Sequence, residues 1–380
     1  MWTGNLKTNM KKTLIVVETS YAGMGPYVSE IVNSFMPQDE VFYFFHELDD
    51  DYYPRNIKPE LLHKSFFVTG KNSLKFKLYT NLSWKYGFDN KVIELCKKWA
   101  IQQVYFINGC CDPSLVKKLK KMSVTSISAV HDLHPHEAKK SIIKMIRHYN
   151  FYARNKYGRK CCDVCITNSK EQYRELITMY PNKKIFYHDF PSLVTDKIAF
   201  GSLEVEELKD NSEPYILFFG RIEKYKGVDI LIEAFRKLTN VTDNLKLVVA
   251  GKGKVDYQPT DNDRILLIDR FIKDEEVSDL YRKASFVVYP YISATQSGVL
   301  SVAMYFGTPI IASDVPFFKD IMQDSKAGLL FSNGDSNDLY LKMKEMLSKD
   351  MKSFRDNEKS YYQNKYDKGA IRTALLKIFN

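Results

Sequence analysis

Long apolar runs are absent from this 380-residue sequence. No run approaches the roughly 20 residues that a membrane-spanning helix needs. The first ten residues, MWTGNLKTNM, are polar and lack the apolar stretch of a signal peptide. The sequence therefore predicts a cytoplasmic protein, and it leaves open a peripheral position on the cytoplasmic face of the inner membrane.

The sequence is also poor in cysteine pairs that could hold a metal. It has six cysteines, and only Cys162 and Cys165 form a C-x-x-C pair. A structural zinc site usually needs two such pairs or added histidines. The surrounding segment, CCDVCITNS, is typical of a buried strand. We therefore expect buried, reduced thiols rather than a zinc or redox site.

Acidic residues are missing from one long stretch, Lys139–Lys160, which contains eight lysines and arginines. Two interpretations remain open. The stretch either attracts an anionic lipid surface, or forms a helix with one solvated basic face. The whole chain has a formal net charge of +10, which suits anionic ligands without choosing among them. No nucleic-acid recognition motif is present, so we expect no nucleic acid as a partner.

The sequence contains two series of short apolar runs separated by helical patterns. The first series is Lys12–Glu18, Val41–Phe45, Gln102–Gly109, Thr125–Asp132 and Cys161–Ser169, with a further strand ending at His188-Asp189. The second series is Tyr215–Arg221, Lys246–Gly253, Ile265–Phe271, Phe286–Tyr291 and Thr308–Asp314. This alternation predicts an α/β protein with two parallel, doubly wound sheets.

The segment Ser202–Pro214 is acidic and poor in large apolar side chains, which is typical of a linker. We therefore predict domains at residues 1–200 and 214–352, with a linker at about 201–213. Ligands of doubly wound sheets bind at the carboxyl ends of the strands.

Two groups of residues follow strands of the second series. Gly220, Arg221 and Lys226 surround one strand end, and two cations there could bind a diphosphate. The loop Thr295-Gln296-Ser297-Gly298 precedes a helix whose free amides could bind an anion. Plain alternatives exist for both: solvated surface cations, and ordinary capping of the helix by Thr295 or Ser297.

At this point the chain resembles a known family. The segment GRIEKYKGVDILIEAF, residues 220–235, is similar to the G-R-x(4)-K-G signature of the retaining GT-B transferases of glycosyltransferase family 4 (group 1). The resemblance continues through AGKGKVD, FIKDEEVSDLY and the stretch Tyr289–Asp314. It implies two facing Rossmann-like domains, a nucleotide-sugar donor bound by the C-terminal domain, no essential metal or cofactor, and a tail helix, residues 353–380, that crosses back to the N-terminal domain.

The resemblance also implies the site residues. The expected catalytic residues are His131, Arg221 and Lys226. The expected donor-binding residues are Gly23, Gly25, Gly220, Arg221, Lys226, Gly251, Phe271, Thr295, Gln296, Ser297 and Gly298. His131 matches the His-Asp of the family, where the histidine contacts the donor sugar. A purely structural histidine is the alternative, and a zinc site made by Asp132, His134 and His136 is not expected.

The chain departs from the family at two positions. Most members carry two glutamates separated by seven residues, and the corresponding residues are Ala294 and Val302. The loop Thr-Gln-Ser-Gly instead resembles a subgroup associated with surface-polysaccharide assembly. The expected function is retaining transfer of a sugar from a nucleoside diphosphate sugar to a hydroxyl of a growing glycan, which could be lipid-linked. The missing carboxylates favour one alternative, a donor-binding subunit without catalysis.

Overall fold

The structure is a computed structural model that divides into two compact units. The first unit comprises Met1–Pro191 and Lys368–Asn380, and the second comprises Ser192–Asp367. The structure describes residues 10–18, 24–47, 52–69, 87–108, 112–133, 152–153, 155–239, 244–255, 257, 264–294, 296–366 and 368–380.

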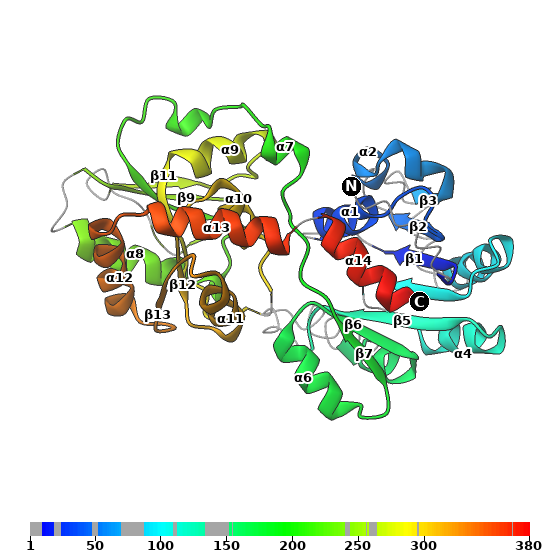
Figure 1. The fold of residues 1–380 in the computed structure, drawn as a ribbon. Helices are drawn as coiled ribbons and strands as arrows, with labels where there is room; N and C mark the ends of the chain where they lie inside the picture. The colour runs from blue at the N-terminus through cyan, green and yellow to red at the C-terminus, as the bar shows by residue number, and fades with distance from the viewer. Residues whose placement is uncertain are drawn as a thin grey trace. The chain divides into compact units, whose positions relative to one another are not determined.

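The first unit is built on a seven-stranded parallel sheet with the order β3-β2-β1-β4-β5-β6-β7 (Figure 1). Its strands are β1 (Thr13–Val17), β2 (Val41–Glu47), β3 (Ser65–Thr69), β4 (Gln103–Phe106), β5 (Thr125–Val130), β6 (Val164–Thr167) and β7 (Lys184–Tyr187). All five residues of β1 are buried. Strands covered by helices on both faces are continuous apolar runs, which is why the sequence predicted them.

Helices α1 (Met24–Ser34), α2 (Tyr52–Asn56), α4 (Pro113–Lys121) and α6 (Lys170–Met179) belong to the first unit, as do η1 (Pro59–Lys64) and a helix over residues 87–98. Local sequence starts two of them. Asp112 caps α4, where its side chain accepts a hydrogen bond from the Ser114 amide, and Pro113 follows at the first helical position. Ser169 caps α6 in the same way through the Gln172 amide.

The last helix, α14 (Lys368–Phe379), packs against α1 in the first unit (Figure 1). The side chain of Phe379 is fully buried and stacks on Phe35 with a ring separation of 6.1 Å. The Gln103 amide donates to the Phe379 carbonyl at 2.7 Å. Arg372 forms a two-pronged ion pair with Asp39, at 2.8 and 2.6 Å. The chain therefore returns to the first unit through apolar packing and two partly buried ion pairs, the second between Lys368 and Glu30 at 3.5 Å.

The second unit contains a six-stranded parallel sheet with the order β10-β9-β8-β11-β12-β13. Its strands are β8 (Tyr215–Phe219), β9 (Lys246–Ala250), β10 (Ile265–Ile268), β11 (Ala284–Tyr289), β12 (Ile310–Ser313) and β13 (Gly328–Phe331). Its helices are α7 (Asp196–Ala199), η2 (Glu206–Leu208), η3 (Lys224–Lys226), α8 (Val228–Thr239), α9 (Asp274–Lys283), α10 (Val299–Phe306), α11 (Pro316–Ser325), α12 (Ser336–Ser348) and α13 (Lys352–Lys365). Both units are α/β units built on parallel sheets, as the sequence predicted.

The division between the units differs from the predicted boundaries in two places. The segment predicted as a linker buries Val205 and Leu208 in the core of the second unit, so the division falls at Pro191 rather than near residue 200. The tail predicted to join the first unit from residue 353 splits in two. Helix α13 packs on α10 and α11 in the second unit, and only α14 joins the first.

The Arg372–Asp39 ion pair of α14 generates a stability prediction. Replacing Arg372 by Met leaves the Asp39 carboxylate, which is 7% exposed, without its cation. We expect the free energy of unfolding to fall by about 2 kcal/mol, which is the scale for removing a partner of a buried charged acceptor. In urea unfolding of the full chain, the unfolding midpoint of Arg372→Met should lie at a lower urea concentration than that of the unaltered protein. The matched control, Lys377→Met, changes an exposed cation on the same helix, and an equal effect in both variants would contradict a specific role for the pair.

Candidate functional site

The loop between β8 and α8 brings the two predicted cations to the carboxyl edge of the second sheet. Gly227 has φ +63°, and a Cβ there would lie 2.0 Å from the Pro290 carbonyl oxygen. Gly251 has φ +145°, and a Cβ there would lie 2.0 Å from the Gly220 carbonyl oxygen. Both positions therefore require glycine. This close backbone contact fixes the β8–α8 loop against the segments that follow β9 and β11.

Lys226 lies in η3 and is only 8% exposed. Its Nζ donates a hydrogen bond of 2.7 Å to the Tyr291 hydroxyl and lies 4.3 Å from the centre of the Tyr291 ring. No carboxylate in the described part of the chain forms an ion pair with Lys226. A mostly buried ammonium without an acidic partner is a strong attractor for an anionic ligand.

Arg221 differs from Lys226 in both exposure and pairing. Its side chain is 46% exposed, and its Nη1 lies 2.8 Å from Oε1 of Glu223 two residues along the loop. An exposed pair of this kind contributes at most about 1 kcal/mol. An incoming diphosphate could therefore displace the Glu223 carboxylate at small cost.

The loop after β11 is connected with Lys226 through Tyr291. Ser297 Oγ is 3.5 Å from the Tyr291 hydroxyl, and Gly298 is the residue before α10. Gln296 is half-buried, and Thr295 lies outside the described residues. At the two positions where the family carries glutamate, Ala294 packs against the core and Val302 is 2% exposed within α10. Val302 is therefore an apolar core position in this chain.

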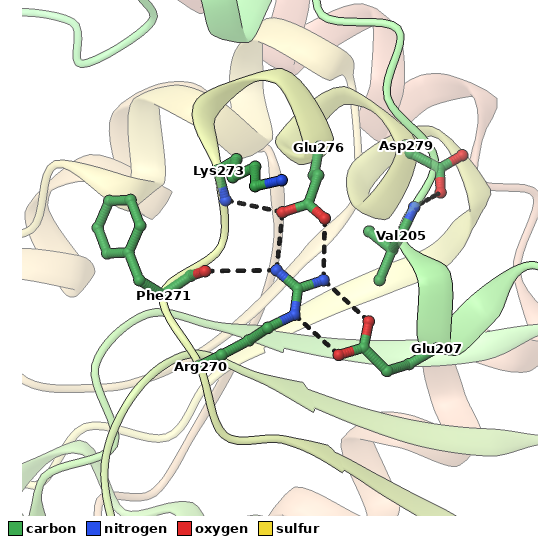
Figure 2. Close-up of polar contacts among 7 residues, drawn as sticks. All are labelled: Val205, Glu207, Arg270, Phe271, Lys273, Glu276 and Asp279. Carbon is green, nitrogen blue, oxygen red and sulfur yellow. Dashed lines mark hydrogen bonds and ion pairs between the residues drawn. The ribbon is translucent and has the colours of Figure 1, made fainter.

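Gly220 and Gly251 contact each other in this region, whereas Phe271 belongs to a different strand end. Figure 2 shows Arg270 between Glu207 and Glu276, with the ring of Phe271 directed away from that group. Arg270 forms two hydrogen bonds with each carboxylate, all between 2.8 and 2.9 Å, and its Nη1 also donates to the Phe271 carbonyl. The Phe271 side chain is 74% exposed. A rigid backbone thus presents an exposed aromatic ring just beyond the end of β10.

His131 follows β5 in the first unit, as predicted. Its Nε2 lies 2.6 Å from the Ile107 carbonyl oxygen. A carbonyl only accepts hydrogen bonds, so Nε2 carries the proton and Nδ1 is left as an acceptor. That Nδ1 is buried and has no hydrogen-bond partner among the described residues. Burial lowers the pKa of His131, which therefore stays neutral.

Residues that the sequence did not single out support His131. The Gln172 amide donates to the His131 carbonyl at 3.0 Å, and the Tyr27 ring meets the imidazole edge to face at 5.1 Å. The Tyr27 hydroxyl donates to Asn168, whose amide contacts His188. Burial lowers the pKa of His188 to about 4. His188, for which the sequence indicated no role, is part of this buried network, and no local motif marks Gln172 or Asn168.

Other predicted residues of the first unit lie elsewhere or outside the described chain. The predicted glycine-rich loop ends earlier than expected, because α1 begins at Met24 and Gly25 is buried in its first turn. Gly23, His134 and His136 lie outside the described residues. Within the described ranges, no group of three or more His, Cys, Asp or Glu side chains is arranged to hold a metal ion.

Cys162 and Cys165 are buried free thiols with their sulfur atoms 3.6 Å apart. Their burial and their mutual contact agree with the predicted buried, reduced state. Among the helices that the structure describes, none is long and apolar enough to cross a membrane.

Comparison with known proteins shows which enzymes the second unit resembles. Residues 202–367, nearly the whole second unit, match the family model of the glycosyl transferases group 1. The second unit is therefore similar to the group 1 glycosyltransferases. The chain is 28% identical over 330 residues to an uncharacterized glycosyltransferase of Methanocaldococcus jannaschii, covering 83% of this chain and 84% of that protein.

Other relatives match over shorter stretches or by fold alone. A phosphatidyl-myo-inositol mannosyltransferase of Mycobacterium leprae is 29% identical over 126 residues, 32% of this chain and 34% of that protein. The chain thus aligns with about a third of the length of the first curated relatives. Among solved structures, Anabaena HepE in complex with UDP-glucose shares the fold with a TM-score of 0.66 at 14% identity, covering 97% of this chain and 99% of HepE.

The Arg221–Glu223 pair generates a prediction about anion binding. Replacing Glu223 by Gln frees the Arg221 guanidinium, so we expect the affinity for inorganic pyrophosphate to rise by up to about fivefold at low salt. Titration calorimetry measures the change, which should shrink as salt screens the charges. The control Glu206→Gln makes the same charge change at an exposed residue of η2. Weaker pyrophosphate binding by Glu223→Gln would count against competition between the carboxylate and the anion.

Proposed function

We propose that this chain is a group 1 glycosyltransferase that moves a sugar from a nucleoside diphosphate sugar to a hydroxyl of a growing glycan, with retention at the anomeric carbon. The observation that carries the proposal is the nearly buried, acid-free Lys226 ammonium at the carboxyl edge of the second sheet. Breakage of the donor glycosidic bond builds negative charge on the leaving diphosphate. Lys226 and Arg221 supply the positive charge that stabilises it.

The remaining donor contacts follow from this placement. Ser297, whose hydroxyl lies 3.5 Å from that of Tyr291, is a candidate for the phosphates and the sugar, and so are Gln296 and the amides at the start of α10. Strand β10 is two strands from β8 in the sheet, roughly 10 Å away at the usual strand spacing. That distance suits a nucleoside, and we assign the exposed Phe271 ring to the base by stacking.

His131 takes a role at the sugar in this proposal. Because its Nε2–H is engaged by the Ile107 carbonyl, the imidazole offers only Nδ1, which accepts a hydrogen bond from a hydroxyl. It binds as a neutral group rather than as a charged acid. No protein nucleophile is required if the leaving-group oxygen itself accepts the proton of the attacking hydroxyl on the same face of the sugar. We propose that this chemistry needs no metal ion.

The nature of the acceptor is a separate part of the proposal. We propose a surface glycan, which is lipid-linked in many such systems, because the Thr-Gln-Ser-Gly loop resembles a subgroup associated with surface-polysaccharide assembly. The name of the M. leprae relative indicates a lipid acceptor for that protein. A donor-binding subunit without catalysis is the alternative, and it is favoured by Ala294 and Val302 at the glutamate positions.

The cation pair provides the direct test. Arg221→Ala and Lys226→Ala should each lower turnover about 100-fold, the scale for losing one contact to charge that develops in the transition state. Lys224→Ala is the matched control, since Lys224 lies in the same loop with an exposed side chain. Turnover is measured with a panel of nucleotide sugars, as donor hydrolysis or transfer. Donor binding without any turnover in the unaltered protein would favour the non-catalytic subunit.

The basic stretch Lys139–Lys160 leads to a prediction about membranes. Each lysine or arginine near an anionic surface contributes about 1 kcal/mol, so several together give reversible attachment. We expect the chain to sediment with vesicles containing anionic lipid, not with neutral vesicles, and to be released by salt. Replacing Lys139, Lys140, Lys144 and Arg147 by Gln should abolish sedimentation.

The control for this experiment removes the same number of positive charges elsewhere in the first unit. Lys97, Lys117, Lys120 and Lys121 are exposed, the last three on α4. Their replacement by Gln should leave sedimentation largely intact. Equal losses in both variants, or equal binding to neutral vesicles, would favour a plain solvated helix over a membrane-binding one.

A further inference from the structure

Tyr291 lies just beyond the end of β11 and is 1% exposed. Its hydroxyl accepts the 2.7 Å hydrogen bond from Lys226, and its ring lies under the same ammonium at 4.3 Å. The hydrogen bond to the hydroxyl is therefore the closer of the two contacts, and the aromatic ring is a more distant neighbour of the same cation. Neither the family motif nor the local sequence marks this tyrosine.

The surroundings of Tyr291 fix its position. Its ring meets the Phe318 ring edge to face at 5.1 Å, and its carbonyl accepts a hydrogen bond of 2.6 Å from Ser313. The next amide, of Ile292, donates at 2.7 Å to the carbonyl of Tyr225, the residue before Lys226. Both partners of the Lys226–Tyr291 contact are therefore joined through their backbones as well as through their side chains.

The chemistry of the contact distinguishes Tyr291 from an acidic partner. A carboxylate would neutralise the cation, as Glu223 does for Arg221 in the same loop. The phenol is neutral, so it removes rotational freedom from the flexible lysine without cancelling its charge. An ammonium has three hydrogen-bond donors, and the phenol occupies one of them. The others remain available to an anion.

We propose that Tyr291 is a positioning residue that holds the Lys226 ammonium where the leaving diphosphate needs it. The inference rests on the proposed function, since it assumes that Lys226 acts on the diphosphate. Tyr291 acts through Lys226, and Ser297, 3.5 Å from the same hydroxyl, connects this pair to the loop before α10. The position of the cation therefore depends on β11 as well as on the β8–α8 loop.

A double-mutant cycle tests the inference. Tyr291→Phe keeps the ring and loses the hydroxyl, so turnover should fall about tenfold, the lower range for a hydrogen bond to a charged group. The donor KM should change much less, because the contact matters most when charge builds on the leaving group. The turnover of Tyr291→Leu, which also loses the ring, should be lower still. In a Lys226→Ala background, Tyr291→Phe should cause no additional loss.

Tyr281→Phe is the matched control. Tyr281 is also a fully buried tyrosine of this unit, and its hydroxyl lies 3.1 Å from the Tyr289 hydroxyl. It should lower stability comparably to Tyr291→Phe and leave turnover near the unaltered level. Losses that are additive in the Lys226→Ala background, or equal losses of turnover in Tyr281→Phe and Tyr291→Phe, would overturn the inference in favour of a structural role.

A measurement that needs no turnover separates this inference from the proposed function. The NMR signal of the Lys226 ammonium should shift and exchange faster with water in Tyr291→Phe, and remain unchanged in Tyr281→Phe. An unchanged Lys226 signal in Tyr291→Phe overturns the inference whatever the activity. If the signal responds but the unaltered protein turns over no donor, the proposed function fails instead. The same cycle is then measured on the affinity for inorganic pyrophosphate, where additive losses would overturn the positioning role.

Discussion

Strands that are buried on both faces impose the main constraint on this protein. Such a strand has no place for an uncompensated charge along its length, so charged side chains gather in the loops at its ends. In the second unit, β8 is apolar from Tyr215 to Phe219, and the first cation after it is Arg221. The glycines at 227 and 251 then allow the loop backbones to approach one another closely. The position of Arg221 and Lys226 in the loop after β8 therefore follows from the burial of the sheet.

Arg221 and Lys226 differ in exposure and in hydrogen-bond partner. Arg221 is exposed and paired with an acid that can be displaced, whereas Lys226 is nearly buried beside a neutral phenol. An exposed arginine side chain can adjust its position and bind a phosphate by two hydrogen bonds. A fixed lysine supplies a point charge at one position. The absence of glutamate at Ala294 and Val302 makes this neutral, aromatic support of Lys226 more important for the proposed chemistry.

Periodicity and motif predicted the central strands of both sheets and the placement of Arg221 and Lys226 after β8. The sequence pattern did not predict β3 and β13, which are edge strands. Their residues are mostly half-buried and their apolar runs are short, so they lack the continuous pattern of the central strands. The segment predicted as a linker is packed on the second unit, because two isolated apolar residues, Val205 and Leu208, anchor an otherwise acidic segment. Tyr291 and Gln172 could not be recognised, because their roles arise from contacts between residues far apart in the sequence.

The return of α14 to the first unit has a consequence for folding. Residues 368–379 are translated after every residue of the second unit, yet Phe379 and Arg372 complete the packing around α1 and Asp39. The first unit is therefore discontinuous in sequence, and until residues 368–379 dock it lacks a helix and exposes the apolar surface that α14 covers. A chain cut before residue 368 would keep every residue of the second unit and leave this surface of the first unit uncovered, so its N-terminal half should be the more prone to aggregation.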